Sequence, residues 1–226
     1  MTAPYYSDDA VTIYHGDCRE IMPELNFDVI VTDPPYGIGW SRGANPARSS
    51  AAHAGILNDH DTSARDEAHA VSGHDRPAIM FGSFYAPAPV NVKQILVWHK
   101  PNDSGVVGST TGFRRDAEPI YLCGDIAKRT VRWSSVVKST RLSIKDIAAT
   151  AGHPHAKPED IVRQLIELNG GVILDPFMGS GTTLRAAKDL GRKAIGIELD
   201  EKYCEIAAKR MAQGVLNFGA HESDTP

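Results

Sequence analysis

The sequence predicts an α/β fold in which helices cover a doubly wound, mostly parallel sheet. Short apolar runs of strand length recur along the chain, and in its last third they alternate with segments that carry apolar residues at helical spacing. The run Phe27 to Thr32 also stops at a pair of prolines, which is typical of a buried strand that ends in a rigid turn. Alternation of strands and helices indicates a parallel sheet with helices on both faces.

Six apolar runs are expected to form parallel strands, and three segments are expected to form helices. The strands are Phe27 to Thr32, Ala78 to Gly82, Ile95 to Trp98, Pro119 to Cys123, Val172 to Asp175 and Ala194 to Glu198. The helices are Ile161 to Leu168, Thr182 to Leu190 and Glu201 to Gln213. Pro158 and the two acids after it favour the start of the first helix, and Gly191 ends the second.

Length and composition indicate one globular domain over residues 1–226. The chain is 42% hydrophobic and 23% charged, as in ordinary soluble proteins. Its apolar runs are too short to cross a bilayer and no secretory signal precedes them, so we expect a cytoplasmic protein without a membrane partner. Cys18, Cys123 and Cys204 are too widely spaced to suggest a disulfide framework or a zinc site.

Two stretches do not fit the alternation of strands and helices. Gly37 to Pro77 is poor in large apolar residues and is expected to be a variable insertion, either a loop or a partly helical cover. Its four histidines are irregularly spaced and predict a solvated loop rather than a metal site, so no metal is expected. These histidines are His53, His60, His69 and His74. A tail over Gly214 to Pro226 is expected to be solvated.

The second such stretch, Asp125 to Gly152, is a short basic insertion. The chain as a whole has a net charge of −4, so any DNA contact needs a local basic patch. This insertion supplies one, although a solvated surface is the alternative. The residues expected to contact DNA are Lys128, Arg129, Arg132, Lys138, Arg141 and Lys145. Trp133 lies among them and could stack on a base, whereas Trp98 lies in an apolar run and is expected in the core.

A strand, a glycine-rich turn and a helix start follow one another between Val172 and Thr183. Glycines in such a turn let the backbone approach a ligand and present amides at a helix N-terminus. An acid, Glu198, ends the next strand, where nucleoside-binding folds place a carboxylate on the ribose hydroxyls. Neither a dinucleotide fingerprint nor a phosphate-binding loop is present, so a nucleoside without a polyphosphate fits better. A turn without a ligand is the structural alternative.

A second cluster, Asp33-Pro34-Pro35-Tyr36, lies at the carboxyl end of the predicted strand before it. Open α/β sheets place their ligands at this edge. The prolines leave free carbonyls, an acid and an aromatic ring. Hydrogen bonds from an exocyclic amine to Asp33 and to the Pro34 carbonyl would favour a pyramidal nitrogen, and Tyr36 would stack on the base. Catalytic roles are therefore expected for Asp33, Pro34, Pro35 and Tyr36.

With both clusters in view, the chain resembles the β-group of amino-DNA methyltransferases, in which a DPPY motif precedes an FxGxG motif in a permuted order. Both stand here in that order, at Asp33 to Tyr36 and at Phe177 to Gly181. The segment His153 to Pro158 is similar to the family's HPTQKP segment and departs from it at His155 and Ala156. Glu198 matches the acid that binds the ribose.

The resemblance implies that the cofactor is S-adenosylmethionine. Gly16-Asp17-Cys18 is similar to the family segment whose Asp contacts the adenine of the cofactor, although a local cap is the alternative for Asp17. The residues expected to bind the cofactor are Asp17, Cys18, Asp33, His153, Lys157, Pro158, Asp175, Pro176, Phe177, Gly179, Ser180, Gly181, Thr182, Glu198 and Leu199.

The resemblance also implies a seven-stranded, Rossmann-like sheet of the class I methyltransferase type and a restriction-modification setting. The expected reaction is site-specific methylation of adenine N6 in double-stranded DNA, after the base has been flipped out. Asp33 is the discriminating residue, because cytosine-N4 enzymes of the family more often carry Ser there. Cytosine N4 is the alternative target, and a cofactor- or DNA-binding module without catalysis is the second alternative. A homodimer is possible in the family.

Overall fold

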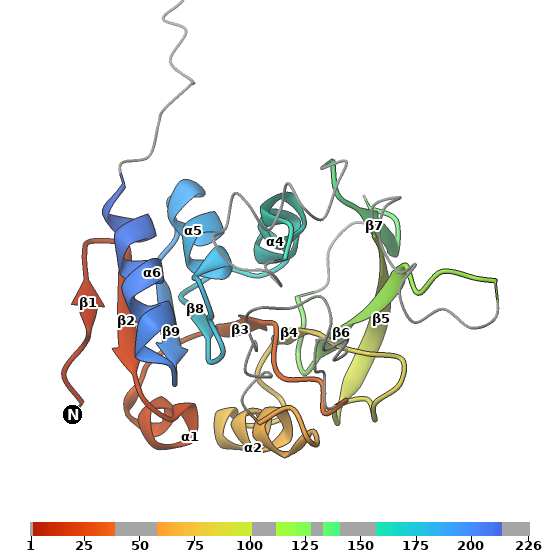
Figure 1. The fold of residues 1–226 in the computed structure, drawn as a ribbon, viewed down its shortest axis with the longest axis horizontal. Helices are drawn as coiled ribbons and strands as arrows, with labels where there is room; N and C mark the ends of the chain where they lie inside the picture. The colour runs from red at the N-terminus through yellow and green to blue at the C-terminus, as the bar shows by residue number, and fades with distance from the viewer. Residues whose placement is uncertain (1, 39–57, 101–111, 128–132, 141–156, 214–226) are drawn as a thin grey trace, which may run out of the picture.

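The protein has three layers, with helices on both faces of one sheet (Figure 1). The computed structural model describes residues 2–38, 58–100, 112–127, 133–140 and 157–213. Helices α4, α5 and α6 cover one face of the sheet, and α1 and α2 cover the other (Figure 1). This arrangement confirms the expected fold class.

The described residues contain nine strands, which lie in the order β1-β2-β9-β8-β3-β4-β6-β5-β7. The strands are β1 (Tyr6–Ser7), β2 (Val11–His15), β3 (Val29–Thr32), β4 (Ala78–Phe81), β5 (Val92–His99), β6 (Ala117–Cys123), β7 (Val136–Lys138), β8 (Ile173–Asp175) and β9 (Ala194–Glu198). The resemblance implied seven strands, and β2 is a further strand that was not among the six predicted runs. The remaining two strands, β1 and β7, extend the sheet at its two edges by short segments. Such short segments carry too little apolar pattern to be seen in the sequence.

The central strands β2, β9, β8, β3 and β4 are parallel, as expected. The run Pro119 to Cys123 is a correction, because it lies in β6, which is antiparallel to both β4 and β5. A run of buried apolar residues looks the same in either direction, so the sequence could not give its orientation. Since β6 is reversed, β5 and β7 again point the same way as β4. Their carboxyl ends therefore share one edge with those of β3 and β4.

The described helices are α1 (Cys18–Ile21), α2 (Ser63–Ser72), α4 (Glu159–Ile166), α5 (Thr182–Asp189) and α6 (Glu201–Ala212), with a 3-10 helix at Met22–Glu24. The bounds of α4, α5 and α6 match those of the three expected helices to within two residues. Helix α2 forms the partly helical cover expected within residues 37–77, of which 39–57 lie outside the described residues. His69 is a correction, because it lies buried in α2 with its ring 4.8 Å from that of His74 rather than in a solvated loop.

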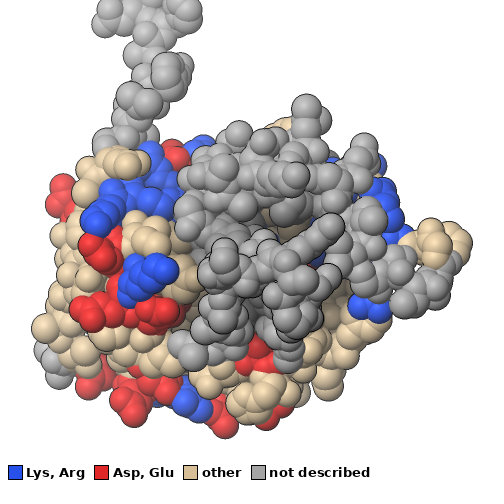
Figure 2. All heavy atoms as spheres, in the orientation of Figure 1, with Lys and Arg blue, Asp and Glu red and all other residues tan. Residues whose placement is uncertain are grey.

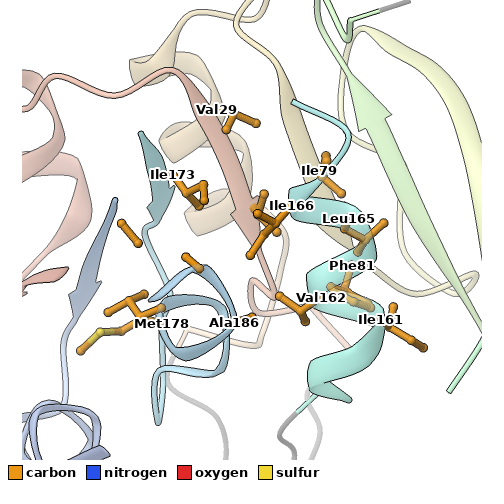
Figure 3. Close-up of a cluster of buried hydrophobic side chains, with 14 of the residues drawn as sticks. Val29, Ile79, Phe81, Ile161, Val162, Leu165, Ile166, Ile173, Met178 and Ala186 are labelled. Carbon is orange, nitrogen blue, oxygen red and sulfur yellow. The ribbon is translucent and has the colours of Figure 1, made fainter. Parts of the chain in front are cut away.

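The larger core lies between the sheet and α4, α5 and α6 (Figure 3). Ile161, Val162, Leu165 and Ile166 form the apolar face of α4 and are each only 1% exposed. They pack against the central strands and hold the first turn of α4 over the sheet (Figure 3). Because Lys157 comes two residues before this helix, the packing of α4 fixes where that lysine enters the site.

Candidate active site

The DPPY motif and the glycine-rich turn meet at one edge of the sheet. Strands β3 and β8 are parallel neighbours, with Ile30 opposite Leu174. At their carboxyl ends the Thr32 hydroxyl donates a 2.6 Å hydrogen bond to Asp175 Oδ1. Both side chains are buried, so this bond joins two motifs that are 143 residues apart in the sequence. The function inferred from the sequence required these two loops to lie side by side at one edge of the sheet, and they do.

Asp33 directly follows β3, and its side chain lies in a cluster of charged and aromatic side chains. Its Oδ2 accepts a 2.7 Å hydrogen bond from Lys157 Nζ, and its Oδ1 accepts one of 2.8 Å from the Tyr36 hydroxyl. The Lys157 ammonium also lies 5.2 Å from the ring of Tyr36 and within 6 Å of two further aromatic rings, those of Phe81 and Trp98. Trp98 is buried, as expected.

Charge in this cluster is balanced by Glu118, at the start of β6. Its Oε2 lies 3.2 Å from the Tyr36 hydroxyl and 3.8 Å from Lys157 Nζ, and its Oε1 is paired with Lys100. Burial alone would raise the pKa of Glu118, but the charges of Lys157 and Lys100 outweigh it and lower that pKa. Glu118 is therefore a carboxylate at neutral pH.

Lys157 and Tyr36, which are also part of this cluster, keep their protons at neutral pH. Burial lowers the pKa of Lys157, but the charges of Asp33 and Glu118 outweigh it and raise that pKa. Burial and the same two carboxylates raise the pKa of Tyr36 well above its ordinary value. The cluster thus holds an ammonium and a neutral phenol beside Asp33.

The glycine-rich turn between β8 and α5 has backbone angles that favour glycine. Gly179 and Gly181 have φ values of 50° and 80°, and a Cβ on Gly181 would approach that of Ala207 to 3.0 Å. At Gly179 a Cβ would meet no atom of the described residues within 4 Å, so they leave space on that side of the turn. Arg210 of α6 donates to the Ser180 carbonyl at 2.7 Å and holds the turn from behind.

Glu198, at the end of β9, lies directly beside this turn. Its Oε2 accepts a 2.9 Å hydrogen bond from the Gly179 amide, and its Oε1 accepts one from the Asp200 amide. Burial raises its pKa despite these hydrogen bonds. Leu199, the next residue, is 44% exposed. The Glu198 carboxylate, the Gly179 backbone and the exposed Leu199 side chain are thus neighbours. They lie at the edge of the sheet that is expected to bind a nucleoside.

Asp17 lies near the same rim but is engaged locally. It is the N-cap of α1, and its carboxylate accepts hydrogen bonds from the backbone and the guanidinium of Arg19. Cys18 is buried, and burial raises its pKa to about 12. The Gly16 amide donates to the Glu198 carbonyl at 2.9 Å, so the two loops adjoin. The cap that was the alternative for Asp17 is present, and a cofactor contact from it remains a prediction.

Comparison with known proteins places the chain in a family. A family model described as DNA methylase, N6/N4 type, matches residues 27–209. The chain belongs to this DNA methylase family. Type II methyltransferase M.ScaI from Streptomyces caespitosus is 28% identical over 92% of this chain and 83% of that protein.

Two solved structures share the fold of this DNA methylase. The cytosine-N4-specific PvuII DNA methyltransferase aligns with a TM-score of 0.66 at 15% identity, over 94% of this chain and 90% of that one. M1.HpyAVI in complex with S-adenosylmethionine aligns with a TM-score of 0.59 at 21% identity, over 89% and 99% of the two chains. These two structures confirm the fold, and the family model confirms the family resemblance and with it S-adenosylmethionine as the expected cofactor.

The residues of the methylase that face the turn fit this cofactor. Gly179 leaves open space, the Glu198 carboxylate is held at the rim by amides, and the buried Thr182 hydroxyl has no hydrogen-bond partner among the described residues. Pro176 is buried and Phe177 partly buried beside them. When bound, S-adenosylmethionine supplies an electrophilic methyl group. Lys157 and Pro158, which were expected among the cofactor residues, lie beside Asp33 and at the N-cap of α4, and a cofactor contact from them remains a prediction.

Several expected site residues cannot be placed. His153 and the basic residues Lys128, Arg129, Arg132, Arg141 and Lys145 lie outside the described residues. Lys138 is exposed at the end of β7, on the carboxyl edge of the sheet, and Trp133 is 42% exposed. Within the described ranges, no three His, Cys, Asp or Glu side chains are grouped so as to hold a metal ion, and no helix is long and apolar enough to span a membrane.

Glu118, Lys100 and Thr32 belong to the site but were not among the expected residues. Each is a polar residue at one end of an apolar run: Glu118 is the second residue of β6, Lys100 directly follows β5, and Thr32 is the last residue of β3. A polar side chain at the end of a buried strand was the signal in the sequence that could have identified these three residues. The antiparallel register of β6, which places Glu118 opposite Trp98 at the carboxyl edge, was not available from the sequence.

Asp175 predicts a measurable pH dependence of stability. Burial, against the hydrogen bond from Thr32, raises its pKa from 3.8 to about 6. A carboxyl with a raised pKa in the folded state costs stability as it ionises, so its contribution is lost as pH rises from about 4 to about 6. Asp175→Asn should gain about 1.4 kcal/mol over wild type per pH unit across this window, and the difference should be constant above it.

Urea unfolding of both proteins at pH 4, 5, 6 and 7 measures this difference. Asp160→Asn is the matched control, because hydrogen bonds from Thr140 and Ser139 outweigh burial and lower the pKa of Asp160. Because its pKa lies below 3.8, its stability contribution is lost only at lower pH, so its difference from wild type should be nearly constant between pH 5 and pH 7. Parallel stability curves for wild type and Asp175→Asn would show that Asp175 does not carry this cost.

Proposed function

We propose that this DNA methylase transfers the methyl group of S-adenosylmethionine to N6 of adenine in double-stranded DNA. The observation that carries the proposal is the position of the Asp33 carboxylate, one residue from the Thr32 to Asp175 hydrogen bond that joins the motifs. Asp33 thereby stands beside the turn proposed to bind the cofactor. A carboxylate there accepts hydrogen bonds from an exocyclic amine and aligns its lone pair with the methyl group.

The side chains around Asp33 support a role as acceptor rather than as nucleophile. Lys157 engages Oδ2 at 2.7 Å and so fixes the orientation of the carboxylate. Oδ1 faces the Tyr36 hydroxyl, which a donor from the substrate could replace. The amine is itself the nucleophile, so no covalent enzyme intermediate is needed, and the Pro34 carbonyl is proposed as the second acceptor.

Cytosine N4 is the second candidate target. It is favoured by the fold shared with the cytosine-N4-specific PvuII enzyme. Adenine is preferred because Asp rather than Ser stands at position 33, and the resemblance associates Asp with adenine. Mass spectrometry of nucleosides from DNA treated with the enzyme and labelled cofactor separates the two. We expect N6-methyladenine, and N4-methylcytosine as the labelled product would overturn the choice of base.

Substitution of Asp33 tests its role directly. Asp33→Ala should lower methyl transfer at least about 100-fold, because one of the groups that orient the amine is lost. Binding of S-adenosylmethionine, measured by calorimetry, should change less than about threefold, which also shows that the variant is folded. Asp33→Asn keeps the size of the side chain and one acceptor oxygen, so its rate of methyl transfer should lie between those of wild type and Asp33→Ala. Transfer close to wild type in Asp33→Ala would contradict the proposed role.

A stacking surface beside the site is proposed to contact DNA around the flipped base. Phe84 and Tyr85 follow β4 at the carboxyl edge and are 55% and 70% exposed. Arg115, which precedes β6, lies 4.9 Å from the Tyr85 ring, so a cation and an aromatic face adjoin. Bases stack on such rings, and arginine adds charge for phosphates. On the face of the molecule that Figure 2 shows, Lys and Arg side chains gather near β5 and β7 and also over α6, where acids lie among them.

Tyr85→Ala tests this surface. Loss of one stacking contact should raise the KM for DNA about tenfold, since stacking is worth about 1–3 kcal/mol per base, with little change in kcat. Tyr5→Ala is the matched control, because Tyr5 is 39% exposed beside β1 at the other end of the sheet. Equal KM values for wild type and Tyr85→Ala would exclude Tyr85 from the DNA interface.

A further inference from the structure

Glu118 contacts the site through side chains that surround Asp33. It comes from β6, opposite Trp98 of β5, and its side chain is 17% exposed. The two oxygens of its carboxylate contact different partners. One is paired with Lys100, and the other faces the Tyr36 hydroxyl at 3.2 Å and Lys157 at 3.8 Å. Lys100 therefore anchors a carboxylate that points toward the DPPY motif.

Both oxygens of Asp33 are occupied in this structure. Lys157 donates to Oδ2 and the Tyr36 hydroxyl donates to Oδ1. The hydroxyl has one proton and lies between two carboxylates, at 2.8 Å from Asp33 and 3.2 Å from Glu118. It can donate to one of them at a time. An incoming amine can use Oδ1 only when the hydroxyl donates elsewhere.

We propose that Glu118 is a positioning residue that accepts the Tyr36 hydroxyl when the target amine replaces it on Asp33 Oδ1. The phenolic proton stays on Tyr36, and only its acceptor changes. Glu118 does not touch the substrate and acts through Tyr36. The proposal rests on the role of Asp33 under the proposed function, but not on whether the base is adenine or cytosine.

Charge makes Glu118 a suitable second acceptor. A hydrogen bond to a carboxylate is roughly twice as strong as one to a neutral oxygen. The ammonium of Lys157 stays between the two carboxylates and balances both, while Lys100 balances Glu118 from the other side. The hydroxyl can therefore exchange one charged acceptor for another without leaving a buried charge unpaired.

A double-mutant cycle distinguishes this role from a structural one. The variants are Glu118→Gln, Tyr36→Phe and the combination of both, assayed by tritium transfer from labelled cofactor to unmethylated DNA. Glu118→Gln keeps the size of the side chain but weakens the acceptor, so kcat should fall about tenfold while both KM values change less than about threefold. In the Tyr36→Phe background the same substitution should change kcat less than about threefold, because no hydroxyl remains to be moved.

Asp189→Asn is the matched control. Asp189 lies at the far end of α5, is 11% exposed and, like Glu118, is paired with two cations, Arg163 and Arg185. Loss of its charge should lower stability without changing kcat. A second measurement does not depend on turnover. Carbon NMR of labelled tyrosine, assigned with Tyr36→Phe, should show a lower pKa for Tyr36 in Glu118→Gln and no change in Asp189→Asn.

Three results would overturn the proposal. They are an unchanged kcat in Glu118→Gln, the same fold loss in both Tyr36 backgrounds, or a Tyr36 pKa that does not move. A labelled product other than N6-methyladenine would overturn the proposed base alone, because total tritium transfer is measured whatever the base. A wild-type protein that methylates no DNA would overturn the proposed function, and the NMR titration would still show whether Glu118 controls Tyr36.

Discussion

The pairing of β3 with β8 is the constraint on which the site depends. Parallel neighbours bring their carboxyl ends to one edge, and the buried bond from Thr32 to Asp175 fixes that edge with a polar contact. Each partner satisfies a group that would otherwise be buried without one. The cost falls on Asp175, whose pKa is raised by burial to about 6. Stability is thus given up where the two halves of the site must meet, as is common at functional sites.

Around this junction the protein buries charge in a balanced cluster. Lys157 and Lys100 face Asp33 and Glu118, and three aromatic rings surround the Lys157 ammonium. A buried charge without a partner is costly, so each member depends on the others. The result is a set of donors and acceptors held close to Asp33 by their mutual charges. Donors and acceptors that are held in place in this way can orient a weak nucleophile.

The sequence predicted the parts of the site that are local in the chain. The DPPY motif, the glycine-rich turn and Glu198 each follow an apolar strand, so their edge of the sheet could be inferred. Contacts between distant segments could not be inferred. The direction of β6 decides that Glu118 reaches Tyr36, and apolar periodicity carries no information on direction. Lys157 was expected near the cofactor, and only the packing of α4 reveals that it binds Asp33.

One small contact couples the β7 edge of the sheet to the charged cluster around Asp33. The Asp160 carboxylate accepts hydrogen bonds from the hydroxyls of Ser139 and Thr140, so the chain just after β7 is tied to the first turn of α4. Lys157 comes two residues before that turn and donates to Asp33. Substitutions at Ser139 or Thr140 would therefore loosen the anchor of Lys157, so the outermost strand can tune the cluster without touching it.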